Sequence, residues 1–484
     1  MSDAAPGGVS QMPVPAMPLV GVQIGATSFR DEGVGRVLDV VGERAAANAV
    51  LVATPTWSSA TGGRAPVGYA DHGAQEDQPG WLGGNYATVH PEYYRDSRLG
   101  PVGRAADYDT WDVFDAVIPA ASERGMKTYA LMDESSGAHE LRRYPSFLKC
   151  LEVDIWNKPA RRPCYNHPDY RNWHLSIVED YIKSYALDGL CWRASRSGPL
   201  HLLAEGPAAQ GLGLVSCFCV HCREKALDRG IDWRRAQTGF RRLVLWNADV
   251  ATGQRPVDGA FVTFWRLLLE FPEILAWQSL WVDGLHQLYR DIFGTVRAYR
   301  PQMVVGWEID QNLTFSPFDR AGQNFADLSH ICDFLKIGTY NASGGPALAS
   351  WVHNLARTVF ADATPEQVYP VLLAMMGLDE APLSDLGDTG LSVDYVRSET
   401  ARAVIANEGR CGIWSGIDVD IPAAVHGRPG SQSSMSYPDQ VTGAVTAALE
   451  AGAGGVVLGR KYAEMSLENL SAAGTAVRRA VRSP

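Results

Sequence analysis

Two aspartates, Asp418 and Asp420, end the stretch CGIWSGIDVDIP and are well placed to do chemistry. The apolar residues before them are typical of a strand that is buried on both faces, and Pro422 would end its hydrogen-bond ladder. Because residues two apart on a strand share a face, the two carboxylates are predicted to project together. Barrels of the α/β class hold their catalytic groups at such carboxyl ends of strands. The alternative is a turn cap or a surface ion pair, since aspartate is also common in loops.

Polar residues end five other predicted strands in the same way, which predicts one polar pocket built from several strands. Glycoside hydrolysis needs a pair of carboxyl groups, one protonated to assist the leaving oxygen and one ionised to attack or to activate water. Asp418 is the predicted nucleophile or base, and the other catalytic candidates are Asp133, Glu134 and Glu308. The remaining strand-end residues are Arg193, Arg196, Asp310, Lys336, Tyr340, Asn341, Arg460 and Lys461.

Aromatic residues near these strand ends could stack on the faces of sugar rings. Trp192, Trp307 and Trp414 are in this position, although a tryptophan there is more often part of the core. The long connection 56–109 is rich in Gly, Tyr, Trp and His, and it includes His90. Connections of this length are often functional, so we expect it to line a polar, ring-shaped ligand site.

Apolar β-type runs alternate with amphipathic helical stretches after residue 18, which is the pattern of a parallel sheet with helical crossovers. A (β/α)8 TIM barrel is therefore predicted over residues 19–484, after a flexible tail at 1–18. There are nine candidate strands for eight places, and the run from Val368 is the expected surplus, although it could equally replace a neighbouring run. The runs begin at Val20, Ala49, Met126, Leu187, Met303, Asp333, Val368, Cys411 and Gly454, and helical patterns cover 34–47, 170–185, 395–407 and 439–451.

A helical insertion after the fourth strand is predicted over about 195–300, because this connection is far longer than usual. It contains Cys217, Cys219 and Cys222, three soft ligands at metal-binding spacing. We expect a closed structural zinc site that pins the insertion to the barrel, and no cofactor is expected for catalysis. The alternative is a set of small buried thiols at a helix start. A fourth ligand could come from Cys164, Cys191, His201 or His221.

Composition excludes several classes of protein. A formal net charge of -11 without a long Lys/Arg run argues against a nucleic-acid partner. No apolar run of membrane length and no secretory signal is present, so a cytoplasmic location without a membrane partner is expected. Eight cysteines are too few for a disulfide scaffold in a chain of 484 residues. A small carbohydrate is the expected partner, and a homo-oligomer is left open.

Six stretches together resemble a group of bacterial TIM-barrel proteins known as hypothetical glycoside hydrolases. They are NYATVHPEYY, CYNHPDYRNW, YALDGLCWR, CFCVHCREKALDRGID, GIDVDIP and GGVVLGRKYAEM. The resemblance covers about Val20 to Ala480 and implies the barrel fold and a glycosidase-like activity, but no particular substrate. The cysteine spacing is also similar to that of the zinc cluster of family-42 β-galactosidases.

One position departs from the pattern that this resemblance implies. In retaining barrels of this clan, a glutamate at the end of the fourth strand is the acid/base, whereas this chain has Ser195. Serine cannot donate a proton as a carboxylic acid does. Another acid must then serve, with Glu205, Glu308 and Glu134 as candidates, or the chain is a diverged member. Asp418 fits the nucleophile position at the end of the seventh strand if the Val368 run is not a strand.

Three functions follow as hypotheses. The first is a glycosidase that acts on a small glycoside or oligosaccharide. The second is a lyase, isomerase or epimerase on a sugar-like metabolite, which would use the same acids with a divalent metal or a lysine amine. The third is a carbohydrate-binding pseudoenzyme without the strand-4 acid. The predicted substrate contacts are His90, Trp192, Arg193, Ser195, Arg196, Trp307, Asp310, Lys336, Tyr340, Asn341, Asp420, Arg460 and Lys461.

Overall fold

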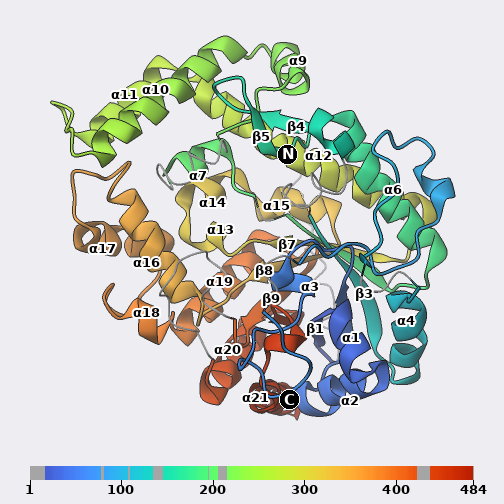
Figure 1. The fold of residues 1–484 in the computed structure, drawn as a ribbon. Coiled ribbons are helices and arrows are strands. Elements are labelled where there is room, and N and C mark those ends of the chain that lie inside the picture. Colours follow the sequence, from blue (N-terminus) through green and yellow to red (C-terminus); the bar gives the residue numbers. More distant parts are fainter. Residues whose placement is uncertain are drawn as a thin grey trace, which may run out of the picture.

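A computed structural model describes residues 17–77, 81–106, 110–134, 145–194, 196–204, 215–421 and 436–482. Eight parallel strands close into a barrel in the order β1-β10-β9-β8-β7-β6-β3-β2, which confirms the predicted (β/α)8 fold (Figure 1). The strands are β1 (Leu19–Gly25), β2 (Ala49–Ala53), β3 (Lys127–Asp133), β6 (Gly189–Arg193), β7 (Val304–Ile309), β8 (Phe334–Gly338), β9 (Gly412–Asp418) and β10 (Gly455–Gly459).

The run from Val368 is a helix, α17 (Pro365–Met376), so the eight places are filled by the other eight candidates. Local sequence explains the helix. Thr364 and Gln367 form a capping box at its start, and a proline occupies the first helical position, where the missing N–H costs nothing. With this run removed, β9 is the seventh strand of the barrel, as the placement of Asp418 required.

Apolar and aromatic side chains fill the lower half of the barrel interior. Leu51, Leu131 and Tyr129 pack there with Phe334 and Trp414, whose rings stack at a centroid distance of 3.5 Å. Because side chains alternate along a strand, the next inward positions lie at the carboxyl ends, above this apolar layer. The polar residues that the sequence places at strand ends therefore lie above a layer of buried apolar side chains.

Helices surround the barrel, and a group of them rises from its rim between β6 and β7 (Figure 1). The β4–β5 hairpin lies beside this group. The α-helices outside the rim group are α1 (Ala26–Glu32), α2 (Val34–Ala45), α3 (Ser59–Gly62), α4 (Val113–Glu123), α6 (Pro168–Ser184), α13 (Asn312–Phe315), α14 (Pro317–Gly322), α15 (Phe325–Leu328), α16 (Gly344–Leu355), α18 (Leu386–Thr389), α19 (Val393–Ala406), α20 (Pro438–Glu450) and α21 (Leu467–Arg482). The rim group is α7 (Pro199–Ala204), α9 (Val220–Asp228), α10 (Trp233–Ala251), α11 (Ala260–Glu270) and α12 (Glu273–Tyr299), and the hairpin strands are β4 (Leu151–Val153) and β5 (Pro159–Pro163). In the described part of the chain, no helix combines the length and the apolar character that crossing a bilayer requires.

Candidate active site

Four charged side chains form one rung at the carboxyl ends of neighbouring strands. Each is the direct partner of the next in the strand register, so all four project into the barrel mouth. In barrel order they are Asp133, Arg193, Glu308 and Lys336. The structure thus brings together two predicted catalytic residues and two predicted substrate contacts.

Glu308 is the centre of this rung and is almost completely buried. Its carboxylate lies 2.9 Å from the Lys336 ammonium and 3.6 Å from the Arg193 guanidinium, and it accepts a 2.9 Å hydrogen bond from Gln23. Burial raises the pKa of Glu308, but the two cations outweigh burial and hold this pKa below its usual value. Glu308 therefore stays ionised and is a poor proton donor, contrary to its prediction as an acid.

Asp133 has the opposite electrostatic character. Burial raises its pKa to about 6, although Arg193 and a 3.0 Å hydrogen bond from Thr61 act against this shift. The nearby charges of Glu308 and Glu134 add to it. Asp133 can therefore hold a proton close to neutral pH, which is what a general acid requires.

Asp418 lies on the far side of the mouth, since three strands separate β9 from β3 in either direction around the barrel. Only 1% of the residue is exposed. One carboxyl oxygen accepts a 2.7 Å hydrogen bond from the Ser343 backbone, and the other has no hydrogen-bond partner among the residues that the structure describes. Burial raises the pKa of Asp418 to about 6, against the opposing effect of Ser343.

A glycine next to Asp418 leaves room for the side chain of Tyr340. Gly459 pairs with Asp418 in the strand register, and a Cβ atom there would lie 2.6 Å from the Tyr340 hydroxyl. Tyr340 accepts a 2.5 Å hydrogen bond from Lys336, so it extends the charged rung toward Asp418. Asn341 follows Tyr340 and is buried at the exit of β8.

The prediction that Asp420 projects together with Asp418 is wrong. The strand ends at Asp418, and Asp420 has a positive φ of 54°, which breaks the alternation of side chains. Its carboxylate accepts hydrogen bonds from the backbone of Ser436 (3.1 Å) and Ser466 (2.8 Å) and from the Asn469 amide. Asp420 thus anchors the start of α21 and is fully buried there.

Glu134 and Arg196 form a buried ion pair beside the mouth, so neither fits its predicted role. Glu134 accepts hydrogen bonds from Arg196 (3.0 Å) and from the hydroxyls of Tyr165 and Tyr170 (2.8 Å each). Arg196 also donates to the carbonyl of Pro163. Arg196 donates to Glu134 through two of its nitrogens, so Glu134 accepts four hydrogen bonds in all. The Arg196 guanidinium is thus committed to Glu134 and Pro163.

Trp192 and Trp307 cannot stack on a sugar, because they point away from the barrel interior. Their inward neighbours occupy the opposite face of each strand, and both rings pack against Tyr289 of α12 at centroid distances of 5.3 and 4.2 Å. They are 1% and 0% exposed. Trp414 does point inward, but it belongs to the apolar layer.

His90 lies at the opposite end of the barrel from the mouth. It forms a 2.7 Å contact with Asp180, near the end of α6, and its ring packs against Tyr185, which precedes β6. The predicted contact between His90 and a substrate in the mouth is therefore wrong. Ser195 and Glu205 lie outside the described residues.

The residues that follow β10 form hydrogen bonds with the loop that follows β2. Lys461 donates to the carbonyls of Ser59 (2.7 Å) and Arg64 (3.0 Å), and burial lowers its pKa to about 8. Arg460 pairs with Glu464 at 2.8 Å. These contacts position α3, which carries the Thr61 hydroxyl that binds Asp133. On the other side, Asp310 lines a cavity of about 10 Å³ next to Glu308 and Arg196.

Sequence reasoning missed four groups at the mouth, which are Gln23, Thr61, Tyr69 and Ser343. Gln23 binds Glu308 and Thr61 binds Asp133, whereas Ser343 acts through its backbone N–H. The hydroxyl of Tyr69 donates to the carbonyl of Asp420 at 2.7 Å. Gln23 is a polar residue in an otherwise apolar strand, and this signal could have found it.

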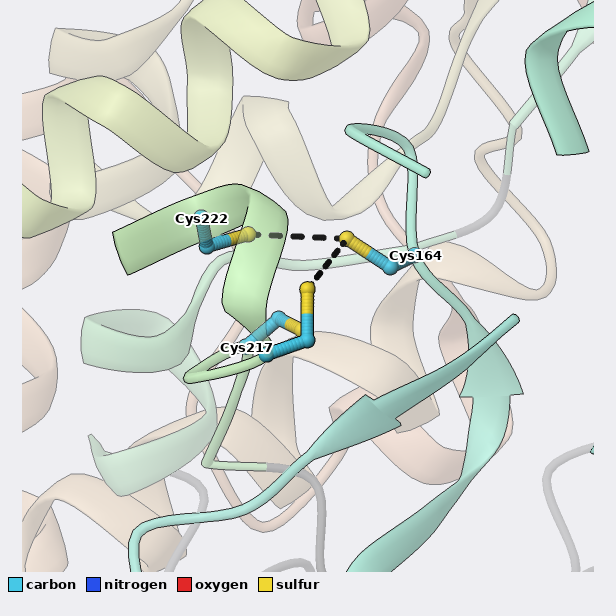
Figure 2. A group of neighbouring side chains, drawn as sticks. Cys164, Cys217 and Cys222 are labelled. Atoms are coloured by element: carbon cyan, nitrogen blue, oxygen red, sulfur yellow. Dashed lines mark hydrogen bonds between the residues drawn. The ribbon is translucent and has the colours of Figure 1, made fainter. Parts of the chain in front are cut away.

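The predicted metal ligands gather at one point outside the barrel. Cys164 is the fourth member of the group, and its sulfur lies 3.5 Å from that of Cys222 (Figure 2). It also lies 3.6 Å from the sulfur of Cys219. With Cys217 included, all four sulfur atoms lie within 4.8 Å of one another, and all four residues are buried. Four thiolates around zinc at about 2.3 Å in a tetrahedron would be about 3.8 Å apart, so the group fits a Cys₄ zinc site.

Backbone and amide donors complete this cluster. The Val153 N–H points at Cys217 (3.4 Å), and Asn166 donates its backbone N–H to Cys164 and its side-chain amide to Cys222 (both 3.3 Å). Such donors stabilise thiolates rather than neutral thiols. The cluster joins α9 to the segment after β5, two parts of the chain that are more than 50 residues apart.

A chain of contacts links the cluster to the barrel mouth. Pro163, next to Cys164, accepts a hydrogen bond from Arg196. Ser216, next to Cys217, donates to Glu152 at 2.7 Å, and Glu152 lies 3.7 Å from the same guanidinium. Arg196 in turn holds Glu134, the residue after Asp133. The cluster therefore supports the segment that carries Asp133, whose pKa is raised.

No protein-family model and no curated protein sequence matches this chain. Similar solved structures include the PgaB (BpsB) glycoside hydrolase domain from Bordetella bronchiseptica, with 13% identity, a TM-score of 0.48 and coverage of 92% of this chain and 94% of that one. The β-galactosidase from Marinomonas ef1 has 12% identity and a TM-score of 0.50, and that from Halorubrum lacusprofundi has 14% and 0.49. Each alignment covers 96% of this chain, which spans 59% and 58% of those enzymes. The likeness to the Marinomonas enzyme agrees with the TIM-barrel fold that the strand order shows, and at 12% identity it concerns the fold alone.

Proposed function

We propose that this protein is a glycoside hydrolase that acts on a small glycoside or oligosaccharide, with Asp133 and Asp418 as its pair of carboxyl groups. One observation carries the proposal. The two residues face each other across the barrel mouth, and burial raises the pKa of each to about 6, while the central Glu308 is held ionised by Lys336 and Arg193. Carboxyl groups with strongly perturbed pKa values that gather in one polar pocket are typical of functional sites.

Asp133 is the proposed general acid and Asp418 the proposed nucleophile or base. Asp133 would protonate the leaving glycosidic oxygen, and the unpartnered oxygen of Asp418 would face the anomeric carbon or a water molecule. A separation of about 5–5.5 Å between the carboxyl groups in the substrate complex corresponds to retention, and one of about 6.5–9.5 Å to inversion. The charged rung would position the substrate and supply a fixed electrostatic field through Glu308, Arg193 and Lys336.

Lysine chemistry is a weaker candidate for this site. An isomerase or lyase that forms a Schiff base needs a neutral amine. Burial lowers the pKa of Lys336, but Glu308 and Tyr340 outweigh burial, raise this pKa and keep the group charged. Burial does lower the pKa of Lys461 to about 8, but this amine donates to the Ser59 and Arg64 carbonyls and is not part of the rung. The geometry of the rung therefore favours the hydrolase.

Asp133→Asn tests the acid role. We expect the variant to lose turnover most on aryl glycosides with poor leaving groups and least on activated ones, because only the former need protonation. In the parent, activity should fall as pH rises through about 6, where Asp133 loses its proton. This limb of the profile should disappear in the variant. Initial rates over pH 4–9 on a panel of aryl glycosides measure both effects.

The matched control is Asp249→Asn, an exposed carboxyl on α10 that should leave rates and profile unchanged. An Asp133→Asn enzyme that keeps the parent profile on all leaving groups would show that Asp133 is not the acid. Glu308→Gln is a second comparison. It should lower activity through lost positioning without removing the alkaline limb.

We also propose that the Cys₄ cluster binds zinc and that this zinc is structural. The support is the number, burial and spacing of the four sulfurs. Four protein ligands leave no open position, which is the arrangement of structural rather than catalytic zinc sites. The metal would neutralise thiolate charge and fix the segment after β5 against α9.

A further inference from the structure

One helix of the rim group has a large apolar face that no described residue covers. On α11, the exposed fractions are 41% for Phe261, 47% for Val262, 52% for Trp265 and 79% for Leu269. Residues four apart share a face of a helix, so Phe261, Trp265 and Leu269 form one stripe. We call these four residues the α11 stripe. In Figure 1, α11 lies at the outer edge of the molecule, beside α10 and away from the strands.

Hydrogen bonds from the first turn of α11 to Asp362 fix this helix, so the α11 stripe lies on an ordered element. The carboxylate of Asp362 accepts hydrogen bonds from the first backbone N–H groups of α11, those of Ala260 (2.9 Å) and Phe261 (3.1 Å). The ring of Phe261 also stacks on Phe360 at 5.4 Å. Capping by a carboxylate at a helix N-terminus satisfies donors that would otherwise remain unpaired. The exposure of the stripe therefore does not come from a frayed helix end.

We propose that the α11 stripe is the contact surface of a homodimer, in which α11 of one copy lies antiparallel against α11 of the other. The stripe is symmetric about Trp265, with one large apolar residue four positions before it and one four positions after. A two-fold axis at Trp265 places the two Trp265 rings together and sets Phe261 of each copy against Leu269 of the other. Isologous contacts require such self-complementarity.

The charges around the stripe are compatible with this arrangement. Arg242 pairs with Glu270 at 2.9 Å, and Arg266 pairs with Asp258 at 2.7 Å, both within one chain. Arg266 and Glu270 lie four apart on α11 and so share one side of the stripe, where each is neutralised by a partner in its own chain. Bringing two copies together buries no unpaired charge and sets no like-charged cluster against itself. The pattern, an aromatic and apolar centre with a charged rim, is that of a protein interface.

The α11 stripe supplies the apolar centre of such an interface and not its whole area. At the observed exposures, the α11 stripe offers on the order of 400 Å² of apolar surface, or about 800 Å² for two copies. Specific interfaces bury about 1,200–2,000 Å² in total. Leu245 on the adjacent α10 is 55% exposed and adds to the contact, as do the charged flanks. Trp265 would be the central anchor, since buried tryptophans dominate such interfaces.

Sedimentation velocity on the full chain tests the proposal. We expect a dimer at micromolar concentration, and we expect the double variant Trp265→Glu/Leu269→Lys to raise the dimer dissociation constant by at least 100-fold without changing the melting temperature. Leu227→Lys on α9, an apolar residue that is 62% exposed, is the matched control and should leave the dimer intact. A monomeric parent, or a dimer that the double variant leaves unchanged, would overturn the proposal.

A cross-link tests the position of the two-fold axis. Only a residue on the axis meets itself, so Trp265→Cys should form an intermolecular disulfide under mild oxidation, whereas Leu227→Cys should not. All eight native cysteines are buried and unpaired, so the introduced thiol is the reactive one. Equal cross-linking of both variants, or none of Trp265→Cys in a dimeric sample, would contradict the antiparallel α11 contact.

Discussion

Replacing Asp418 with asparagine should lower kcat on aryl glycosides by about a thousandfold or more. The substitution keeps the size of the side chain and its contact with the Ser343 backbone, but it removes the charge that attacks the anomeric carbon or activates water. Because the unpartnered oxygen of Asp418 is the one proposed to act, KM should change much less than kcat. Steady-state rates and the dissociation constant of a non-hydrolysed ligand measure the two effects.

The same variant should be more stable than the parent at neutral pH. Asp418 has a folded-state pKa of about 6 and an ordinary unfolded-state pKa of 3.8, so folding favours its protonated form. Its contribution to stability is present below pH 4 and is lost as pH rises through 6. Asparagine carries no charge to bury, so we expect a gain of about 1–3 kcal/mol in unfolding free energy at pH 7 and little change at pH 4. Denaturant titrations at the two pH values provide the test.

These two results together separate catalysis from folding. A variant that is less active and less stable at pH 7 would indicate structural damage rather than lost chemistry. Asp249→Asn serves again as the control, with neither effect expected. If Asp418→Asn turned over substrate as fast as the parent, the assignment of Asp418 would be wrong.

Removing metal from the Cys₄ cluster should lower the melting temperature by at least about 5 °C, because a structural zinc contributes its binding energy to folding. In the proposed site, zinc would tie α9 to the segment after β5, and without it four buried thiols would have to be accommodated without a central cation. The measurement is a thermal melt before and after chelation, with metal content determined in parallel and zinc then restored.

Turnover should fall in the same experiment before the protein unfolds. Arg196 receives support from Pro163 and Glu152, which adjoin the cluster, and it holds Glu134 next to Asp133. Cys222→Ser should reproduce both effects, whereas Cys332→Ala, a buried cysteine outside the cluster, should not. Protein that contains no zinc when purified without chelators, and whose melting temperature does not respond to added zinc, would refute the metal assignment.

The sequence predicted the barrel because eight of its strands are short apolar runs followed by polar residues. This pattern can be recognised without knowing which residues of neighbouring strands pair. It also placed Asp133, Glu308 and Asp418 at the mouth, since each is the last or nearly the last residue of a strand. The Val368 run could have been excluded by its capping residues, Thr364 and Gln367. Short apolar runs alone do not distinguish strand from helix.

Predictions failed where the direction of a side chain depended on a shift of one residue along the strand. They also failed where it depended on partners that are distant in the sequence. Asp420 follows the strand by two residues, and a single left-handed backbone conformation turned it toward α21. Trp192 and Trp307 lie one position away from inward-facing residues, so they face the helices. Glu134 is saturated by donors from α6 and from the segment before it, which local sequence does not show.

Long-range partners explain the remaining gaps. The fourth cysteine, Cys164, lies 53 positions before Cys217 and was only one of four candidates until the fold brought it to the cluster. The electrostatic difference between Asp133 and Glu308 is likewise a tertiary effect. It depends on Lys336 from β8 reaching Glu308 and not Asp133.

The crystal structure of Asp418→Asn with a bound aryl glycoside tests the central claim most directly. A sugar ring should occupy the barrel mouth, with its glycosidic oxygen within hydrogen-bond reach of the Asp133 carboxyl and its anomeric carbon facing residue 418. The separation between the carboxyl of Asp133 and the amide of residue 418 would then assign retention or inversion. A ring bound elsewhere on the molecule, or bound in the mouth with its glycosidic oxygen turned away from Asp133, would contradict the proposed function.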